Sequence, residues 1–223
     1  MSLASIFYDD ARTPELVAFR RELHQMPEVS GDEAATALRV AEFLTALHPD
    51  RLVTGLGGHG VAAVFDSGRP GPSVLFRCEL DALPIREIST SAWRSRIDGK
   101  AHLCGHDGHT AIVAGLATAL AGRRPAKGRV IVLFQPAEET GAGAAAVIAD
   151  PNFAELRPDY SFALHNLPGL PLGVAGIRQG ASNFASEGLR IRLEGKTAHA
   201  SQPENGKSPA AALCALVSGL PGL

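Results

Sequence analysis

The feature that most constrains the fold is an uninterrupted, strand-length run of apolar residues, Val130 to Phe134. Such a run is typical of a central strand that is buried on both faces, as in α/β sheets covered by helices on both sides. Similar runs bounded by Gly or Pro occupy Val61 to Phe65 and Val74 to Leu80, and shorter ones occupy Tyr160 to Leu164 and Val174 to Ile177. We therefore expect a strand in each of these ranges.

Segments with helical periodicity lie between these runs. From Thr13 to about Met26, apolar residues recur at helical spacing, with Pro14 in the first turn. Ser30 and Glu33 have the spacing of a capping box at the start of a second helix. Thr110 to Ala121 is apolar almost all round, which is typical of a buried helix. The alternation predicts an α/β fold with a largely parallel mixed sheet sandwiched by helices.

The pattern changes in the last part of the chain. Leu189 to Glu194 alternates apolar and charged residues, as in a strand with one solvated face, and Pro209 to Ser218 is an Ala- and Leu-rich helical segment. We expect residues 1–184 to form one domain and residues 185–223 to begin a second, α+β domain. The sequence stops before this second domain could close a core.

Composition argues against several classes of partner. The formal net charge of -2 gives no general attraction to nucleic acid or to anionic membranes, and no apolar run approaches the ~20 residues of a membrane span. The first residues lack the pattern of a signal peptide, so we expect a soluble, cytoplasmic protein. Cys78, Cys104 and Cys214 are too few and too scattered for a disulfide framework, and only Cys104 has chemically suggestive neighbours.

The segment from Cys104 to His109 combines a thiol, two imidazoles and a carboxylate with small residues. Cys104 and His106 are two residues apart, so in an extended loop both side chains would point to one side and could bind one metal ion. Taken alone, a Cys-x-His pair is more often a buried cysteine beside a surface histidine. We expect Asp107 and His109 to orient their neighbours rather than to bind metal.

Other strand ends supply residues of the same kinds. Glu138 and Glu139 follow the central apolar run, and in an extended segment one could bind a metal while the other acts as a general base toward water. His165 and Asp81 each follow another predicted strand. Each of these residues has a common structural explanation when taken alone. Because the carboxyl ends of parallel strands share one edge of a sheet, their joint occurrence predicts a metal-dependent hydrolytic site there.

Two further features have less bearing on function. The segment from Gly55 to Gly60 matches the glycine spacing of dinucleotide-binding loops, but a strand rather than a helix follows it. We interpret it as a turn between strands. His24, close to the end of the first predicted helix, could support a metal ligand or be a cation at the helix C-terminus on the surface, and the sequence alone favours the surface.

Taken together, these motifs resemble the peptidase M20 family, and within it the branch of N-acyl-amino-acid amidohydrolases that includes hippurate and indole-acetyl-amino-acid hydrolases. The matching segments are 20–24, 27–28, 77–85, 104–110, 134–139, 163–166 and 195–200. The resemblance implies a zinc-peptidase-like catalytic domain, followed by a lid that also mediates homodimer formation. In such proteins a later segment returns to the catalytic domain and supplies a further histidine ligand, which this sequence does not contain.

The resemblance also implies roles for individual residues. The implied ligands of a two-metal site, occupied by divalent zinc or manganese, are Cys104, His106, Glu139 and His165. Glu138 is implied to be the general base, and Asp81 to orient a ligand. His199 is implied to bind substrate or to stabilise the oxyanion, often in the site of a partner subunit.

The expected activity is hydrolysis of the amide bond of an N-acyl amino acid, a small-molecule substrate, by metal-activated water. One alternative is a hydrolase with Cys104 as nucleophile and His106 or His109 as base, which a chelator would leave active. The other is a truncated chain with little or no activity, acting as an interaction module.

Overall fold

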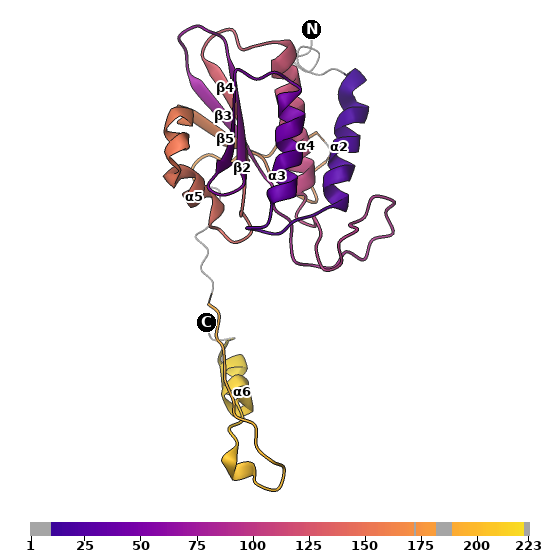
Figure 1. Ribbon diagram of the computed structural model, residues 1–223, viewed down its shortest axis with the longest axis vertical. Coiled ribbons are helices and arrows are strands. Elements are labelled where there is room, and N and C mark those ends of the chain that lie inside the picture. Colours follow the sequence, from indigo (N-terminus) through magenta and orange to yellow (C-terminus); the bar gives the residue numbers. More distant parts are fainter. Residues whose placement is uncertain (1–9, 172, 182–188, 221–223) are drawn as a thin grey trace. The chain divides into compact units, whose positions relative to one another are not determined.

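The computed structural model describes residues 10–171, 173–181 and 189–220 (Figure 1). The chain divides into two compact units, Met1–Gly169 and Leu170–Leu223. The domain boundary expected between residues 184 and 185 lies outside the described residues, so that boundary stays a prediction.

The first unit is built on a five-stranded sheet with the order β1-β2-β4-β3-β5. The strands are β1 (Arg51–Leu56), β2 (Gly60–Asp66), β3 (Ser73–Glu79), β4 (Arg129–Gln135) and β5 (Tyr160–Ala163). β3 pairs in parallel with β4 and β5, whereas β2 is antiparallel to both β1 and β4. The sheet is therefore mixed, and the expectation of a largely parallel sheet holds only for β3, β4 and β5.

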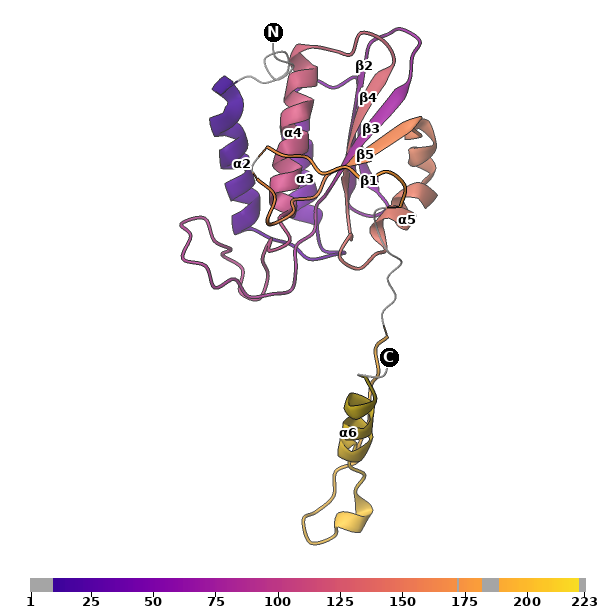
Figure 2. The ribbon, with the colours of Figure 1, turned by 180° about the vertical axis from the view of Figure 1, so that it is seen from behind.

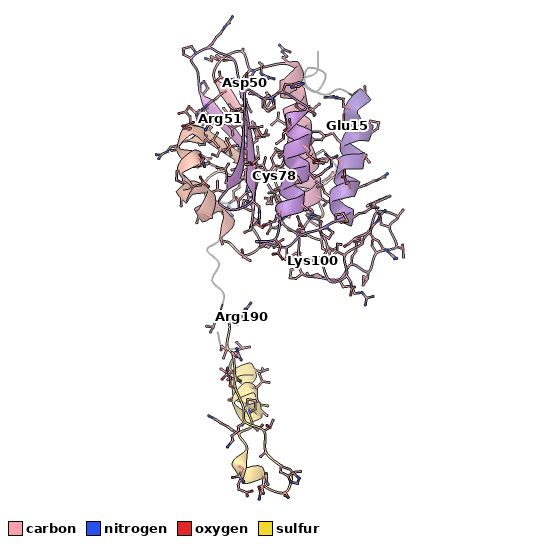
Figure 3. The ribbon with its side chains drawn as sticks, in the orientation of Figure 1. Glu15, Asp50, Arg51, Cys78, Lys100 and Arg190 are labelled. Carbon is pink, nitrogen blue, oxygen red and sulfur yellow. The ribbon has the colours of Figure 1, made fainter. Side chains whose placement is uncertain are left out.

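Helices cover both faces of the sheet, as predicted (Figures 1 and 2). The helices on one face are α2 (Thr13–Gln25), α3 (Ala34–Thr45) and α4 (His106–Gly122), and the opposite face carries α5 (Gly143–Ala149) and the 3₁₀ segment η2 (Pro151–Leu156). Cys78 is wholly buried between the sheet and the three-helix layer (Figure 3).

The central position of β4 explains its uninterrupted apolar sequence. Val132 and Phe134 pack into the core under α2, α3 and α4, whereas Ile131 and Leu133 pack into the core under α5. Each fully buried side chain of this size contributes about 1.5–3 kcal/mol relative to an exposed one. This burial on both faces fixes β4 in the sheet, and with it the point at which the chain leaves toward Glu138.

Some elements differ from those predicted. β1 and α5 were not predicted, but the turn from Gly55 to Gly60 does join two strands, β1 and β2. Val174 to Ile177 and Leu189 to Glu194 are not strands, so both predictions are wrong. Neither segment pairs with a strand among the described residues, and alternating polarity alone does not form a ladder.

The second unit contains the helix predicted near the end of the sequence. Helix α6 spans Ala210–Gly219, and a short 3₁₀ helix, η3, spans Pro203–Asn205. An isolated bridge joins Lys196 and Lys207. In the part of the chain that the structure describes, no helix is long and apolar enough to cross a membrane.

Candidate metal centre

The register of the parallel strands brings the predicted site residues to one edge of the sheet. Glu79 at the end of β3 pairs with Gln135 at the end of β4, and Arg77 of β3 pairs with Ala163 at the end of β5. The segments that follow these three strands therefore leave the sheet side by side. Asp81, the Glu138–Glu139 pair and His165 all lie on these segments, so the predicted convergence of strand ends is present.

Cys104 and His106 lie at the start of a helix and not in the extended loop that was expected. His106 is the first residue of α4, and Gly105 before it has a φ of +95°, so the segment is a helix start rather than an extended loop. A Cβ atom at Gly105 would lie 2.7 Å from Asn166 Oδ1, so any larger residue would displace the Asn166 side chain, and the positive φ independently favours glycine. Even so, one ligand atom each from Cys104, His106 and His165 lie within 4.8 Å of one another.

Glu138 and Glu139 lie in a turn, so the expectation that they face different ways in an extended segment is wrong. Both carboxylates approach the same atom, His106 Nε2, at 3.7 Å. His106 itself is buried, and this Nε2 atom has no hydrogen-bond partner among the described residues. A buried nitrogen that faces carboxylates, a thiol and a second imidazole, without a partner of its own, fits a cation between these groups.

Asp81 and its backbone orient the imidazole of His106. His106 Nδ1 lies 2.8 Å from the backbone oxygen of Asp81, which can only accept, so Nδ1 donates and Nε2 presents its lone pair. The Asp81 carboxylate accepts from Ser30 Oγ at 2.6 Å and from the Glu139 backbone N–H at 2.9 Å. Burial alone would raise the pKa of Asp81, but hydrogen bonding with His106, Ser30 and the Glu139 backbone lowers it to about 2. Asp81 is therefore an anion whose hydrogen bonds hold His106 and Glu139 in place.

His109 supports the segment that carries His165. Its Nδ1 atom lies 2.8 Å from Glu79 Oε2, and its Nε2 atom accepts the Asn166 backbone N–H at 3.0 Å. Burial raises the pKa of Glu79, but the hydrogen bond from His109 and the charge of Arg77 lower it by more than burial raises it, so the net shift is downward. The orienting role expected for His109 thus has a structural basis. Glu79 was not among the predicted site residues, although Glu79 and Asp81, two acids two residues apart at a strand end, were a signal for it.

The electrostatics of Cys104 bear on its chemistry. Burial and the carboxylate of Glu139 raise the pKa of the Cys104 thiol to about 12. A cysteine nucleophile needs a lowered pKa, so this environment argues against the alternative of a cysteine hydrolase. A bound cation has the opposite effect on a coordinating thiol, which it deprotonates.

His24 is buried, so the expectation that it lies at the surface is wrong. Its Nδ1 atom is 3.0 Å from Asp107 Oδ2, and its Nε2 atom is 3.3 Å from Glu87. The hydrogen bond to Asp107 raises the pKa of His24 despite the opposing effect of burial. His24 thereby ties α2 to the first turn of α4, directly beside His106.

Another buried histidine, His102, was not singled out by the sequence analysis. Burial lowers its pKa to about 4, so its ring is neutral near pH 7. Neither ring nitrogen has a hydrogen-bond partner within the described ranges.

Ser30 and Glu33 do not form a capping box, and that prediction is wrong. Glu33 is the N-cap residue of α3, but its own side chain makes no capping hydrogen bond. The Ser30 hydroxyl donates to Asp81 instead, and the Glu33 carboxylate accepts the backbone N–H groups of Gly31 and Ala137. Ser30 bonds to Asp81, and Glu33 bonds to Gly31 and Ala137, so neither side chain forms the bonds of a capping box.

His199 belongs to the second unit, whereas the residues described above belong to the first. Its Nδ1 atom lies 2.8 Å from Ser201 Oγ. The role expected for His199 stays a prediction.

Comparison with known proteins gives consistent matches. Residues 75–218 match the sequence model of peptidase family M20/M25/M40. N-acetylcysteine deacetylase of Bacillus subtilis is 37% identical over 215 residues, which cover 95% of this chain and 56% of that protein. N-acetyldiaminopimelate deacetylase of Priestia megaterium is 34% identical over 206 residues, which cover 92% of this chain and 55% of that protein.

A solved structure agrees with these relatives. The crystal structure of a dinuclear metal-binding peptidase of the M20 family from Bacillus subtilis superimposes with a TM-score of 0.71 at 37% identity. The match covers 78% of this chain and 48% of that one. The chain thus spans about half the length of the curated relatives it matches.

Proposed function

The chain belongs to peptidase family M20/M25/M40, and from this membership we propose that the protein hydrolyses the amide bond of N-acyl amino acids at a two-metal centre. The proposed ligands are Cys104, His106, Glu139 and His165. The observation that carries the proposal is the buried, unpartnered Nε2 atom of His106, at which these side chains converge in the described part of the chain.

The donor set indicates which metals fit. Thiolate, imidazole and carboxylate are the usual protein ligands of zinc, and imidazole and carboxylate donors also suit manganese. Cys104 Sγ lies 3.3 Å from His165 Nε2, close enough for both atoms to approach one ion after small adjustments. A two-metal site is further supported by the related M20 peptidase described as a dinuclear metal-binding protein.

When bound, the divalent ions would lower the pKa of a water molecule and polarise the scissile carbonyl. Glu138 takes the proton from the attacking water and later gives it to the leaving amine, so the products are a carboxylic acid and an amino acid. The turn that carries Glu138 is closed by a hydrogen bond of 2.8 Å from the Gly141 N–H to the Glu138 backbone oxygen. Asp81 keeps His106 and Glu139 oriented while Glu138 exchanges its proton.

The names of the relatives support a proposal for the substrate class. Two curated relatives are named as deacetylases of N-acetylcysteine and of N-acetyldiaminopimelate. We propose that N-acetyl amino acids are substrates here as well, with His199 contributing to substrate binding and the second unit belonging to a lid that forms a homodimer.

The test is an amine-release assay on a panel of N-acetyl and N-benzoyl amino acids. The protein is stripped with a chelator and then reloaded with zinc or manganese. We expect hydrolysis to disappear on stripping and to return on reloading, because the metal supplies the water activation. Hydrolysis that survives complete stripping, or that requires only the Cys104 thiol, would refute the proposal.

A further inference from the structure

The segment from Ser30 to Glu33 carries two polar side chains that serve neither helix capping nor the proposed chemistry. We propose that this segment positions the turn that carries Glu138 and Glu139, with Glu33 as the principal positioning residue. This inference rests on the proposed function, since that function gives the turn its general base and one of its metal ligands.

The environment of Glu33 is unusual for a carboxylate. Glu33 is 0% exposed and makes no ion pair among the residues that the structure describes. Its Oε1 atom accepts the Ala137 N–H at 2.7 Å, and its Oε2 atom accepts the Gly31 N–H at 2.9 Å. A carboxylate is costly to bury, and an apolar side chain would fill the same space without that cost. What the carboxylate adds is a bond to Ala137, a residue 104 positions away in the sequence.

Ala137 is held in a conformation that it would not adopt freely. Its φ is +49°, in the left-handed region that side chains with a Cβ atom disfavour. Hydrogen bonds fix it on both sides, because its N–H is held by Glu33 and its carbonyl accepts the Gly143 N–H at 3.0 Å. Such a conformation persists only where the surroundings enforce it. Since Glu138 follows directly, the conformation of Ala137 sets the direction in which Glu138 leaves β4.

Ser30 acts through Asp81 on the backbone that follows Glu138. Its hydroxyl donates to Asp81 Oδ2 at 2.6 Å, and the same oxygen accepts the Glu139 N–H at 2.9 Å. The segment therefore fixes the backbone before Glu138 directly, through Ala137, and the backbone after it indirectly, through Asp81. Between these two points, both carboxylates of the turn are directed at His106 Nε2.

A matched control separates positioning from general structural support. Glu28 also places its carboxylate on two donors, Thr36 N at 2.7 Å and Thr36 Oγ1 at 2.8 Å, but it does not bond to the turn. Glu33→Gln leaves one of two backbone N–H groups facing an amide NH2, because the two groups bond to different oxygens. Glu28→Gln can keep both of its bonds through the amide oxygen, because both donors share Oε2, so it serves as a control for removing a charge from this segment. We expect Glu33→Gln to weaken zinc binding by about 10- to 100-fold, the usual effect of losing a group that orients ligands. Glu28→Gln should change zinc affinity by less than about threefold.

The decisive readout is rescue by Ala137→Gly, because glycine adopts positive φ without a steric cost. In the Glu33→Gln background this change should restore zinc affinity by at least about threefold, while in the Glu28→Gln background it should have no effect. A role in stability alone predicts no such rescue. If Glu33→Gln fails to fold, Ser30→Ala, which removes a single hydrogen bond, is measured in its place.

Zinc affinity is measured by competition with a chromophoric chelator on the full chain. If the parent binds neither zinc nor manganese, the proposed function fails and this inference falls with it. If the parent binds zinc and Glu33→Gln or Ser30→Ala binds it as tightly as Glu28→Gln does, only the inference is overturned. The absence of rescue by Ala137→Gly would also overturn it.

Discussion

Replacing Asp81 by alanine removes the one acceptor that the Ser30 hydroxyl and the Glu139 amide share. Both hydrogen bonds end on Oδ2, at 2.6 and 2.9 Å, and the carboxylate is wholly buried. We therefore expect Asp81→Ala to destabilise the protein even in the absence of metal, because two donors lose a charged acceptor.

The size of the effect can be worked out in two ways. Hydrogen bonds to a charged group contribute about 1.5–3 kcal/mol each, so two of them give ~3–6 kcal/mol before the cost of burying the carboxylate is subtracted. The pKa of Asp81, about 2 instead of 3.8, reports the balance after that cost. It corresponds to ~2 kcal/mol in favour of the folded, charged state. We expect a loss of ~2–3 kcal/mol in the free energy of unfolding at neutral pH.

The sign of the pH dependence follows from the lowered pKa. A carboxyl group whose folded pKa lies below its unfolded pKa stabilises the protein fully above the unfolded value, and this contribution is lost as the pH falls through the folded value. For Asp81 these values are 3.8 and about 2. The stability difference between the parent and Asp81→Ala should therefore be constant above about pH 5 and narrow as the pH falls from about 4 through about 2.

The assay is urea unfolding in the presence of a chelator, with Asp32→Ala as the control. Asp32 lies 3.8 Å from Lys100 in an ion pair whose Asp32 side chain is 68% exposed, so its loss should change stability by less than ~1 kcal/mol. The reasoning is refuted if Asp81→Ala is no less stable than Asp32→Ala at neutral pH, or if the difference does not narrow in acid.

Three further predictions concern the metal centre and its support. Glu138→Gln should bind zinc like the parent but hydrolyse N-acetyl amino acids at least ~100-fold more slowly, and unchanged turnover would remove Glu138 from its role. In chelator-treated protein, Cys104 should be alkylated far more slowly than exposed Cys214, because its thiol has a pKa of about 12; rapid labelling of Cys104, read by mass spectrometry, would contradict the environment described for it. His24→Gln should lower the thermal unfolding midpoint more at about pH 6 than at about pH 9. Because the pKa of His24 is raised in the folded protein, its protonated ring stabilises the fold below the ordinary value of 6.5, and this stabilisation is lost as the pH rises through the raised pKa. Equal decreases in the midpoint at the two pH values would contradict this.

The sequence predicted the parts of the fold that depend on burial patterns. The apolar run of β4 identified a strand buried on both faces, and the residues after β3, β4 and β5 were expected at one edge. Both follow from local periodicity and from the geometry of parallel strands. β1 was not predicted because Arg51, Thr54 and Gly55 interrupt its apolar pattern. α5 was not predicted because a seven-residue Gly- and Ala-rich helix has almost no periodic signal.

Contacts between distant residues could not be predicted in the same way. Ser30 and Glu33 have the spacing of a capping box, but the donors and acceptors that they bind lie on other loops. His24 looks like a surface residue at a helix end until Asp107, 83 positions later, folds against it. A single sequence shows which residues can form hydrogen bonds, whereas the choice between a local and a tertiary partner is made by packing. The tertiary contacts of Ser30, Glu33 and His24 were therefore missed, whereas Asp81 and His109 were expected to orient their neighbours, and the metal ligands stay a prediction.

The most direct test of the metal centre is X-ray absorption at the zinc edge on the zinc-loaded protein. The account predicts one sulfur ligand at about 2.3 Å together with nitrogen and oxygen ligands at about 2.0–2.2 Å, and loss of the sulfur signal in Cys104→Ser. A parent spectrum with nitrogen and oxygen ligands only, or a sulfur signal that persists in Cys104→Ser, would contradict the assignment of Cys104, His106, Glu139 and His165 as the metal site.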